Sequence, residues 1–240
     1  MVLVLFNTLT NKDKTDAIER LIRGSTPRQD FFLMIILSIL TATFGLLLGN
    51  TAIIIGSMLI APMLYPLLSL SLGIIMSDSK LMTRSFYTIL KSMAYAIVSA
   101  AAVTLLFSSQ FTNLTPLIFS MTQATLPYVV VAIIAGMAGS FALVKPHLNE
   151  TLPGIAISVS LIPPLAVVGI GLARFNWAII SGSLLLFLVN AVGVMFASMI
   201  TFSLMNFYVK RTEAAETVKK EDAKVERDNK RAEKAKENGK

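Results

Sequence analysis

Residues 45–74 read GLLLGNTAIIIGSMLIAPMLYPLLSLSLGI, a stretch with no charged side chain and with prolines at positions 62 and 66. A bilayer core about 30 Å thick takes roughly 20 apolar residues per helical crossing. The part from Thr51 onward is therefore long enough to cross a membrane. Proline lacks an N–H and clashes with the carbonyl four residues earlier, so Pro62 and Pro66 would interrupt the helix near its middle. The stretch predicts a membrane helix that is broken inside the bilayer.

The broken stretch lies within the first of four runs that contain no Asp, Glu, Lys, Arg or His. The chain is 55% hydrophobic and 15% charged, with a mean hydropathy of +0.71, which is unlike an ordinary soluble domain. At about 20 residues per crossing, the first two runs hold two helices each and the others one each. We therefore expect an all-α polytopic membrane protein with six transmembrane helices. The runs are 31–77, 92–144, 151–173 and 175–209.

The charged ends of the chain flank this apolar region. The last 31 residues carry Glu and Lys at helical spacings, which predicts a solvated helix or a disordered tail. The expected organisation is a cytoplasmic N-terminal arm over 1–30, a transmembrane domain over 31–209 and a charged cytoplasmic tail over 210–240. Within the transmembrane domain we expect helices at about 31–49, 51–76, 88–108, 126–144, 152–173 and 177–209.

The basic residues indicate the orientation, because cytoplasmic loops carry an excess of Lys and Arg. Six full crossings place 20 of the 21 basic residues on one side and leave only Arg174 on the other. If the second and fifth segments were re-entrant hairpins, the division would fall to 16 against 5. We therefore expect six crossings, with both termini cytoplasmic, in the inner or plasma membrane. The net charge of +7 fits attraction to the lipid bilayer, and the interleaved acids argue against nucleic acid.

The fifth segment resembles the second. Residues 152–173 read LPGIAISVSLIPPLAVVGIGLA, again with prolines in mid-segment, at Pro163 and Pro164. A shift of 101 or of 102 residues superposes part of the two segments, and the register stays open between them. Each half would have three crossings, so the second half would start on the opposite side of the membrane. The sequence predicts two inverted three-helix repeats, an architecture in which transporters hold substrates near the bilayer midplane.

The proline breaks have two interpretations. Irregular backbone in a membrane survives only inside protein or facing water, and its free carbonyls can bind a cation or polar solute. Alternatively, the prolines serve only as packing kinks. The paired positions favour the cavity. Polar side chains near the breaks are the candidate lining residues, each with a bond to its own helix or a neighbouring helix as the alternative: Asn50, Ser57, Thr151, Ser158, Ser160 and Asn190.

The sequence lacks the residue types that several kinds of functional site require. The predicted spans contain no carboxylate and no histidine, which argues against a proton relay and against an intramembrane hydrolase. With no cysteine and a single histidine, His147, the chain lacks ligands for a metal centre. We therefore expect no catalytic residues, no metal and no cofactor, and a protein that is not an enzyme.

Residues 45–74 and the stretch PGIAISVSLIPPLAVVGIGLA, together with LLLFLVN ending at Asn190, resemble the signature of an uncharacterised prokaryotic family of hydrophobic membrane proteins, domain of unknown function 389. The resemblance covers about residues 31–205. It implies a membrane fold, no established activity, and importance for the following residues: Asn50, Pro62, Pro66, Pro163, Pro164 and Asn190. Met63 and Tyr65 depart from the family pattern.

Two functions follow as hypotheses. The first is a transporter or channel for a small solute or cation, with its site at the broken helices. The second is a membrane scaffold or regulatory subunit that acts through the charged tail. In either case we expect a homo-oligomer.

Overall fold

The structure, a computed structural model, describes residues 10–111, 113–145, 148 and 161–238. Within these ranges every regular element is a helix, which confirms the all-α class. Three candidate lining residues, Thr151, Ser158 and Ser160, lie outside the described residues. The elements are α2 (Asn11–Gly24), α3 (Gln29–Leu48), α4 (Thr51–Ile60), α5 (Leu64–Met76), α6 (Ser79–Leu106), α7 (Pro116–Ser120), α8 (Leu126–Val144), α10 (Ile162–Ala173), α11 (Trp177–Leu204), η2 (Phe207–Lys210) and α12 (Arg211–Asn238).

The apolar helices indicate a multi-pass membrane protein. By length and composition α3, α6, α8 and α11 can each cross a bilayer. Helices α4 and α5, bent by 50° at the break between them, form either one further broken span or a re-entrant loop. Helix α10 has only 12 residues, and the residues directly before it are not described. The described part of the chain thus contains four to five spans, and the sixth crossing stays a prediction.

Helix α6 begins nine residues earlier than the sequence predicted, at Ser79 instead of position 88. Asp78 caps its N-terminus by accepting hydrogen bonds from the N–H groups of Lys80 and Leu81, at 3.0 and 3.1 Å. Two charged residues within this helix have partners outside it. The guanidinium of Arg84 lies 3.4 Å from Asp222, and the ammonium of Lys91 lies 4.6 Å from the centre of the Phe32 ring.

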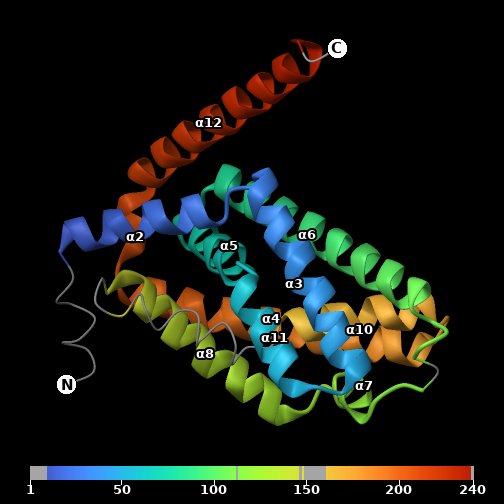
Figure 1. The fold of residues 1–240 in the computed structure, drawn as a ribbon. Helices are drawn as coiled ribbons and strands as arrows, with labels where there is room; N and C mark the ends of the chain where they lie inside the picture. Colours follow the sequence, from blue (N-terminus) through green and yellow to red (C-terminus); the bar gives the residue numbers. More distant parts are fainter. Residues whose placement is uncertain (1–9, 112, 146–147, 149–160, 239–240) are drawn as a thin grey trace.

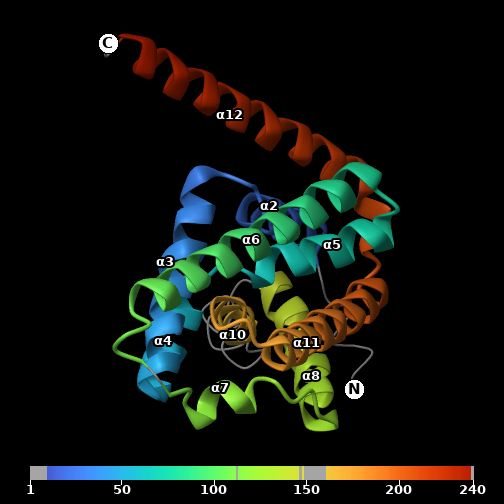
Figure 2. The same ribbon diagram turned by 90° about the vertical axis from the view of Figure 1, so that its right-hand side faces the viewer.

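Two short helices occupy the middle of the bundle. Both α5 and α10 pack against α6 and α11, while α3 packs on α6 and α8 packs on α11. All ten residues from Ile162 to Gly171 are buried, as are most of α5. Helices α2 and α12 lie at one end of the bundle and α7 lies at the other (Figures 1 and 2). In the described part of the chain, two short helices, α5 and α10, therefore form the centre of the bundle.

Three tight corners join consecutive helices, and all three have the same construction. A glycine carbonyl accepts from the N–H group of a residue five positions later, whose own side chain then caps the next helix. The residue before the cap is left-handed, with φ of 51° to 69°. A Cβ on the first glycine would meet the backbone nitrogen of the next helix at 3.0 to 3.1 Å, which explains why glycine stands there. The corners are Gly45–Gly49–Asn50, Gly73–Ser77–Asp78 and Gly171–Phe175–Asn176.

A shift of 98 residues relates the second half of the chain to the first. Helices α6 and α11 both have 28 residues, and both their first and their last residues lie 98 apart. The nine buried positions of α6 all coincide with buried positions of α11 under this shift. Helices α5 and α10 also begin 98 residues apart, at Leu64 and Ile162. Neither shift considered from the sequence, 101 or 102, has this property. Both aligned Pro62 with a proline of α10, but under the shift of 98 Pro163 corresponds to Tyr65 and Pro164 to Pro66.

Helices α3 and α8 correspond under a shift of 97. The first residues, Gln29 and Leu126, are 97 apart, and the eight buried positions of α8 all fall on buried positions of α3. The change from 97 to 98 means one additional residue between α8 and α10, where the chain is mostly outside the described ranges. Agreement in helix limits, corners and burial is what two copies of one three-helix unit would produce.

The C-terminal tail is a helix, and its first half is packed against the rest of the protein, which the sequence did not predict. Ala214, Val218 and Glu221 lie on one face of α12 and are buried, at 0, 2 and 3% exposure. Helix α12 contacts α2, whose own buried face includes Ile18 and Leu21. The tail is therefore docked at the α2 end, and only its outer half extends away from the bundle (Figure 1).

Candidate functional site

The broken helix separates α4 from α5 at residues 61–63. Ala61 and Met63 are buried at 7 and 2% exposure and Pro62 is half-buried, so the irregular backbone is enclosed by protein. The N–H group of Tyr65 donates to the carbonyl of Pro62 at 3.3 Å. Pro66 therefore does not leave the carbonyl four residues before it unpaired. This is a correction to the sequence-based expectation that every proline frees a carbonyl.

The prolines begin helices instead of kinking them. Pro66 is the third residue of α5, and Pro163 and Pro164 are the second and third residues of α10. The first N–H groups of a helix have no partner within the helix, so proline there forfeits nothing. Pro66 and Pro164 are equivalent under the shift of 98. Each half of the protein therefore contains a short, buried helix with a proline at its third position.

Ser57 lies in the last turn of α4, close to the break, and is completely buried. Its hydroxyl donates to the carbonyl of Ile54 at 2.6 Å. Its own carbonyl accepts from the hydroxyl of Ser38 in α3, also at 2.6 Å. A carbonyl at the C-terminal end of α4 thus already binds a hydroxyl from a neighbouring helix. A polar solute or hydrated ion could bind this carbonyl in place of the hydroxyl.

The two candidate asparagines have different surroundings. Asn50 is exposed at the α3–α4 corner, and its side-chain oxygen accepts from the N–H groups of Ala52 and Ile53 at 3.0 and 3.3 Å. Its interactions are those of a helix cap, away from the break. Asn190 is 1% exposed in the middle of α11 and is equivalent to the buried Ser92 of α6. The structure therefore keeps Asn190 in the interior and assigns Asn50 a role in the corner.

The short helix α10 of the second half packs near the α4–α5 break of the first half. Helix α10 contacts α3 and α4, while α5 and α10 share α6 and α11 as packing partners. The side chains of Pro163, Pro164 and Leu161 are buried. Three cavities formed by described residues are lined by other side chains: two lie beside α12, and an apolar groove of about 380 Å³ lies between α8 and α11. None of these three cavities is lined by Pro62, Pro163 or Pro164.

A buried hydroxyl cluster lies between α5, α6 and the end of α2, and the sequence did not single it out. The hydroxyls of Ser25 and Ser85 both bond that of Ser69, at 3.1 and 3.0 Å. Arg84 donates to the hydroxyl of Thr26 at 2.5 Å at the edge of the cluster. The signal that could have found it is the shift of 98, because Ser85 has a buried equivalent in Ser183 of α11. The Ser183 hydroxyl has no hydrogen-bond partner among the described residues.

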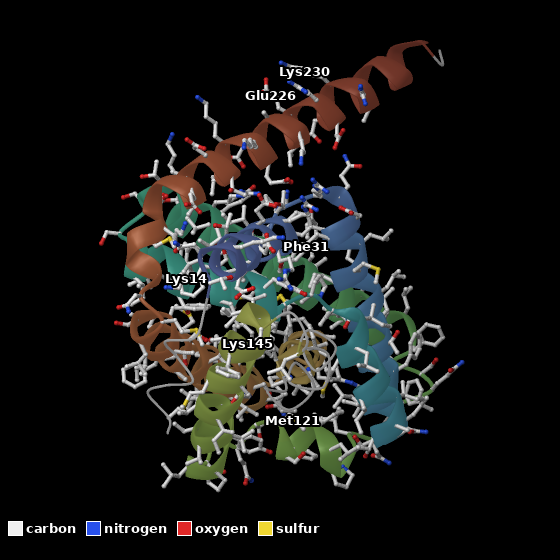
Figure 3. The ribbon with its side chains drawn as sticks, turned by 90° about the vertical axis from the view of Figure 1, so that its left-hand side faces the viewer. Lys14, Phe31, Met121, Lys145, Glu226 and Lys230 are labelled. Carbon is white, nitrogen blue, oxygen red and sulfur yellow. The ribbon has the colours of Figure 1, made fainter. Side chains whose placement is uncertain are left out.

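The charged residues predicted to be cytoplasmic gather at the α2–α12 end. Thr15 of α2 donates to Glu213 at 2.6 Å, and Arg28 donates to Glu221 at 2.7 Å. Figure 3 shows Lys14 and Lys230 toward this end and Met121 toward the opposite one. Arg174, the one basic residue predicted to lie outside, donates to the carbonyl of Phe111 at the end of α6.

Glu221 is the most buried acid of this end. Burial raises its pKa, but a hydrogen bond from Lys224 and the charges of Lys224, Arg28 and Arg23 together outweigh that effect. The pKa of Glu221 therefore lies below its ordinary value of 4.5, and the carboxylate is charged at neutral pH.

Comparisons with known proteins agree with this picture. The family described as domain of unknown function (DUF389) matches residues 58–196, which include the break and both half-length helices. An uncharacterised protein of the archaeon Methanocaldococcus jannaschii, MJ0678, is 31% identical over 171 residues, which are 71% of this chain and 52% of the relative. The chain thus spans about half the length of that curated relative. No solved structure matches this chain.

Proposed function

The chain belongs to the family described as domain of unknown function 389, and from that premise we propose that it is a membrane transporter or channel for a small solute or ion. The observation that carries the proposal is the pair of half-length helices, α5 and α10. Both are buried in the bundle centre, and both begin at equivalent positions marked by Pro66 and Pro164. We further propose that the protein is not an enzyme and that it forms a homo-oligomer in the inner or plasma membrane.

We propose that the two halves are inverted repeats with six crossings in total. The shift of 97 to 98 residues in helix limits, corners and buried positions supports a repeated three-helix unit. An odd number of crossings per unit would invert the second copy. The charge pattern supports the same topology, because ion pairs join the tail to Arg23 of α2 and to Arg84 near the start of α6 at one end of the bundle.

The chemistry of such a site comes from helix ends. The carbonyl end of α4 carries a partial negative charge and the N-termini of α5 and α10 a partial positive charge, all in the low-dielectric interior. A small solute can replace the hydroxyl that Ser38 donates to the carbonyl of Ser57. Because Ala61 and Met63 in the break are buried, transport requires an opening beside them, such as rocking of one repeat against the other.

Flux through the purified protein in liposomes tests the proposal. Pro62→Ala allows α4 to continue toward α5, and Pro164→Ala alters the start of α10; we expect each variant to lose most of the flux. Pro127→Ala is the matched control, because Pro127 also stands in the first turn of a helix, α8, but is exposed at the end of the bundle. Unchanged flux in both break variants contradicts the proposed mechanism.

The outer half of α12 favours the second candidate function, a scaffold or regulatory subunit. Beyond Val225 the helix extends away from the bundle (Figure 2), and its Glu226 and Lys230 are exposed and paired with each other at 2.6 Å. Removing residues 226–240 leaves the docked part of the tail in place. A transporter keeps its flux after this truncation, whereas a scaffold loses the partner that copurifies with it.

A further inference from the structure

Two arginines at the α2–α12 end are paired incompletely. The side chain of Arg84 is only 9% exposed, yet among the described residues its Nη1 has no hydrogen-bond acceptor, and its Nε has only the ion-pair contact with Asp222 at 3.4 Å. The buried Nε of Arg28 has no acceptor among the described residues either. A buried charged donor without an acceptor costs considerably more than a neutral one. The arrangement therefore has unused capacity for an acceptor group.

The groups that now face these arginines come from the C-terminal helix. Glu221 accepts a hydrogen bond from Arg28 at 2.7 Å. Asp222 forms an ion pair with Arg84 at 3.4 Å and is itself 59% exposed. The two acids are adjacent in sequence and reach arginines from two different elements, the start of α3 and the second turn of α6.

The local charge is unbalanced even with the tail docked. Glu221 pairs with Arg28, and Asp222 pairs with Arg84. Glu221 also lies 3.9 Å from Arg23 and 2.7 Å from Lys224. Within ion-pair distance, four cations therefore contact these two carboxylates, while Asp30 and Asp228 line the neighbouring cavity together with Arg28. An anion with more oxygens and more charge than one carboxylate would satisfy donors that the tail leaves without a partner.

A phosphate group has these properties. Guanidinium groups bind phosphate oxygens in bidentate geometry, with charge-assisted hydrogen bonds. The position also suits a group at the bilayer surface, because Arg84 lies two turns before Lys91, whose ammonium is near the rings of Phe32 and Tyr95. A phosphate could thus come from a lipid headgroup or from solution.

We infer that Arg28 and Arg84 form a phosphate-binding site that Glu221 and Asp222 of the C-terminal helix occupy in this structure, so that a bound phosphate group releases the tail. The tail acts as a tethered competitor. The inference concerns binding and the position of α12, and it does not depend on the proposed transport activity.

The distance between α2 and α12 reports the competition. Because the chain has no cysteine, spin labels will attach only to introduced cysteines. We choose Lys12→Cys on α2 and Ala215→Cys on α12, two exposed positions. The full-length protein is measured in nanodiscs of phosphatidylcholine with increasing inorganic phosphate, and separately in nanodiscs containing phosphatidylglycerol without phosphate. Widening in the first series identifies free phosphate as the source, and widening in the second identifies the lipid headgroup.

Variants make the test specific. Arg84→Gln and Arg28→Gln should each weaken the phosphate response on the order of tenfold. Arg20→Gln should leave the response unchanged, because the Arg20 side chain on α2 donates to the carbonyl of Asp16 in its own helix. Glu221→Gln combined with Asp222→Asn should widen the distance without any phosphate.

Three results overturn the inference. The first is an absence of widening in both series. The second is equal widening with chloride at the same ionic strength, which indicates general screening. The third is an unchanged phosphate response in both Arg84→Gln and Arg28→Gln.

Discussion

Gly169 lies where α10 of the second half presses against α6 of the first, so Gly169→Ala tests the central packing of the fold. A Cβ at this position would stand 2.5 Å from the Cβ of Ala100, 2.7 Å from the carbonyl oxygen of Ile97 and 3.0 Å from the backbone nitrogen of Ala101. These atoms belong to backbone or to a side chain that cannot rotate away. Relieving the contacts requires the two helices to separate by roughly 1 Å, and overpacking of this kind costs about 1–3 kcal/mol.

The assay is reversible unfolding of the purified protein in mixed micelles, with Gly56→Ala as the matched control. Gly56 is also a helical glycine, but an added Cβ there would have no neighbour within 4 Å. The control should be neutral or slightly stabilising, since alanine is favoured over glycine in a helix by up to about 1 kcal/mol. Equal stability of Gly169→Ala and Gly56→Ala would refute the close contact between α10 and α6.

The other predictions concern the tail, the corners and the backbone. Because the folded pKa of Glu221 is lowered, its contribution to tail docking is complete above the ordinary value of 4.5 and is lost as the pH falls through the lowered pKa. The distance between spin labels on α2 and α12, measured at decreasing pH, checks this prediction. A distance that does not change down to pH 2 contradicts it. Asn50→Ala and Asn176→Ala should each destabilise the fold by about 0.5–2 kcal/mol, because each removes a helix cap. Transport per folded molecule should be unchanged in Asn50→Ala. Loss of flux without loss of stability would show that Asn50 belongs to the transport site. Ser77→Gly should stabilise the protein by about 1 kcal/mol, because Ser77 is left-handed with φ of 51°, and a lower unfolding midpoint speaks against that conformation.

The sequence predicts the apolar helices well because charge and length are enough to place them. The expected helix at 126–144 is observed with those limits, and the break near Pro62 falls where the prolines indicated. The start of α6 was missed because the limits were placed away from charged residues. Lys80, Arg84 and Lys91 continue the helix because a cap and partners outside the helix satisfy it.

The candidate site was harder to predict because hydrogen-bond partners are a property of three-dimensional packing. The sequence cannot show that the amide of Asn50 caps α4, or that the hydroxyl of Ser57 bonds Ile54. It also cannot show that Glu221 and Asp222 of the tail meet Arg28 and Arg84, which lie about 140 to 190 residues away from them in the chain. The repeat register was within reach, since Pro66 and Gly73 match Pro164 and Gly171 under the shift of 98.

Inversion of the two halves is the central claim, and the cysteine-free sequence allows a direct measurement of it. Ser77 and Phe175 occupy equivalent corners 98 residues apart, and both are exposed. Single Ser77→Cys and Phe175→Cys variants are treated in intact cells with a membrane-impermeant maleimide. The account predicts that the cysteine at position 175 reacts at once and that the cysteine at position 77 reacts only after the membrane is permeabilised. Labelling of both positions from the same side would contradict the inverted repeat.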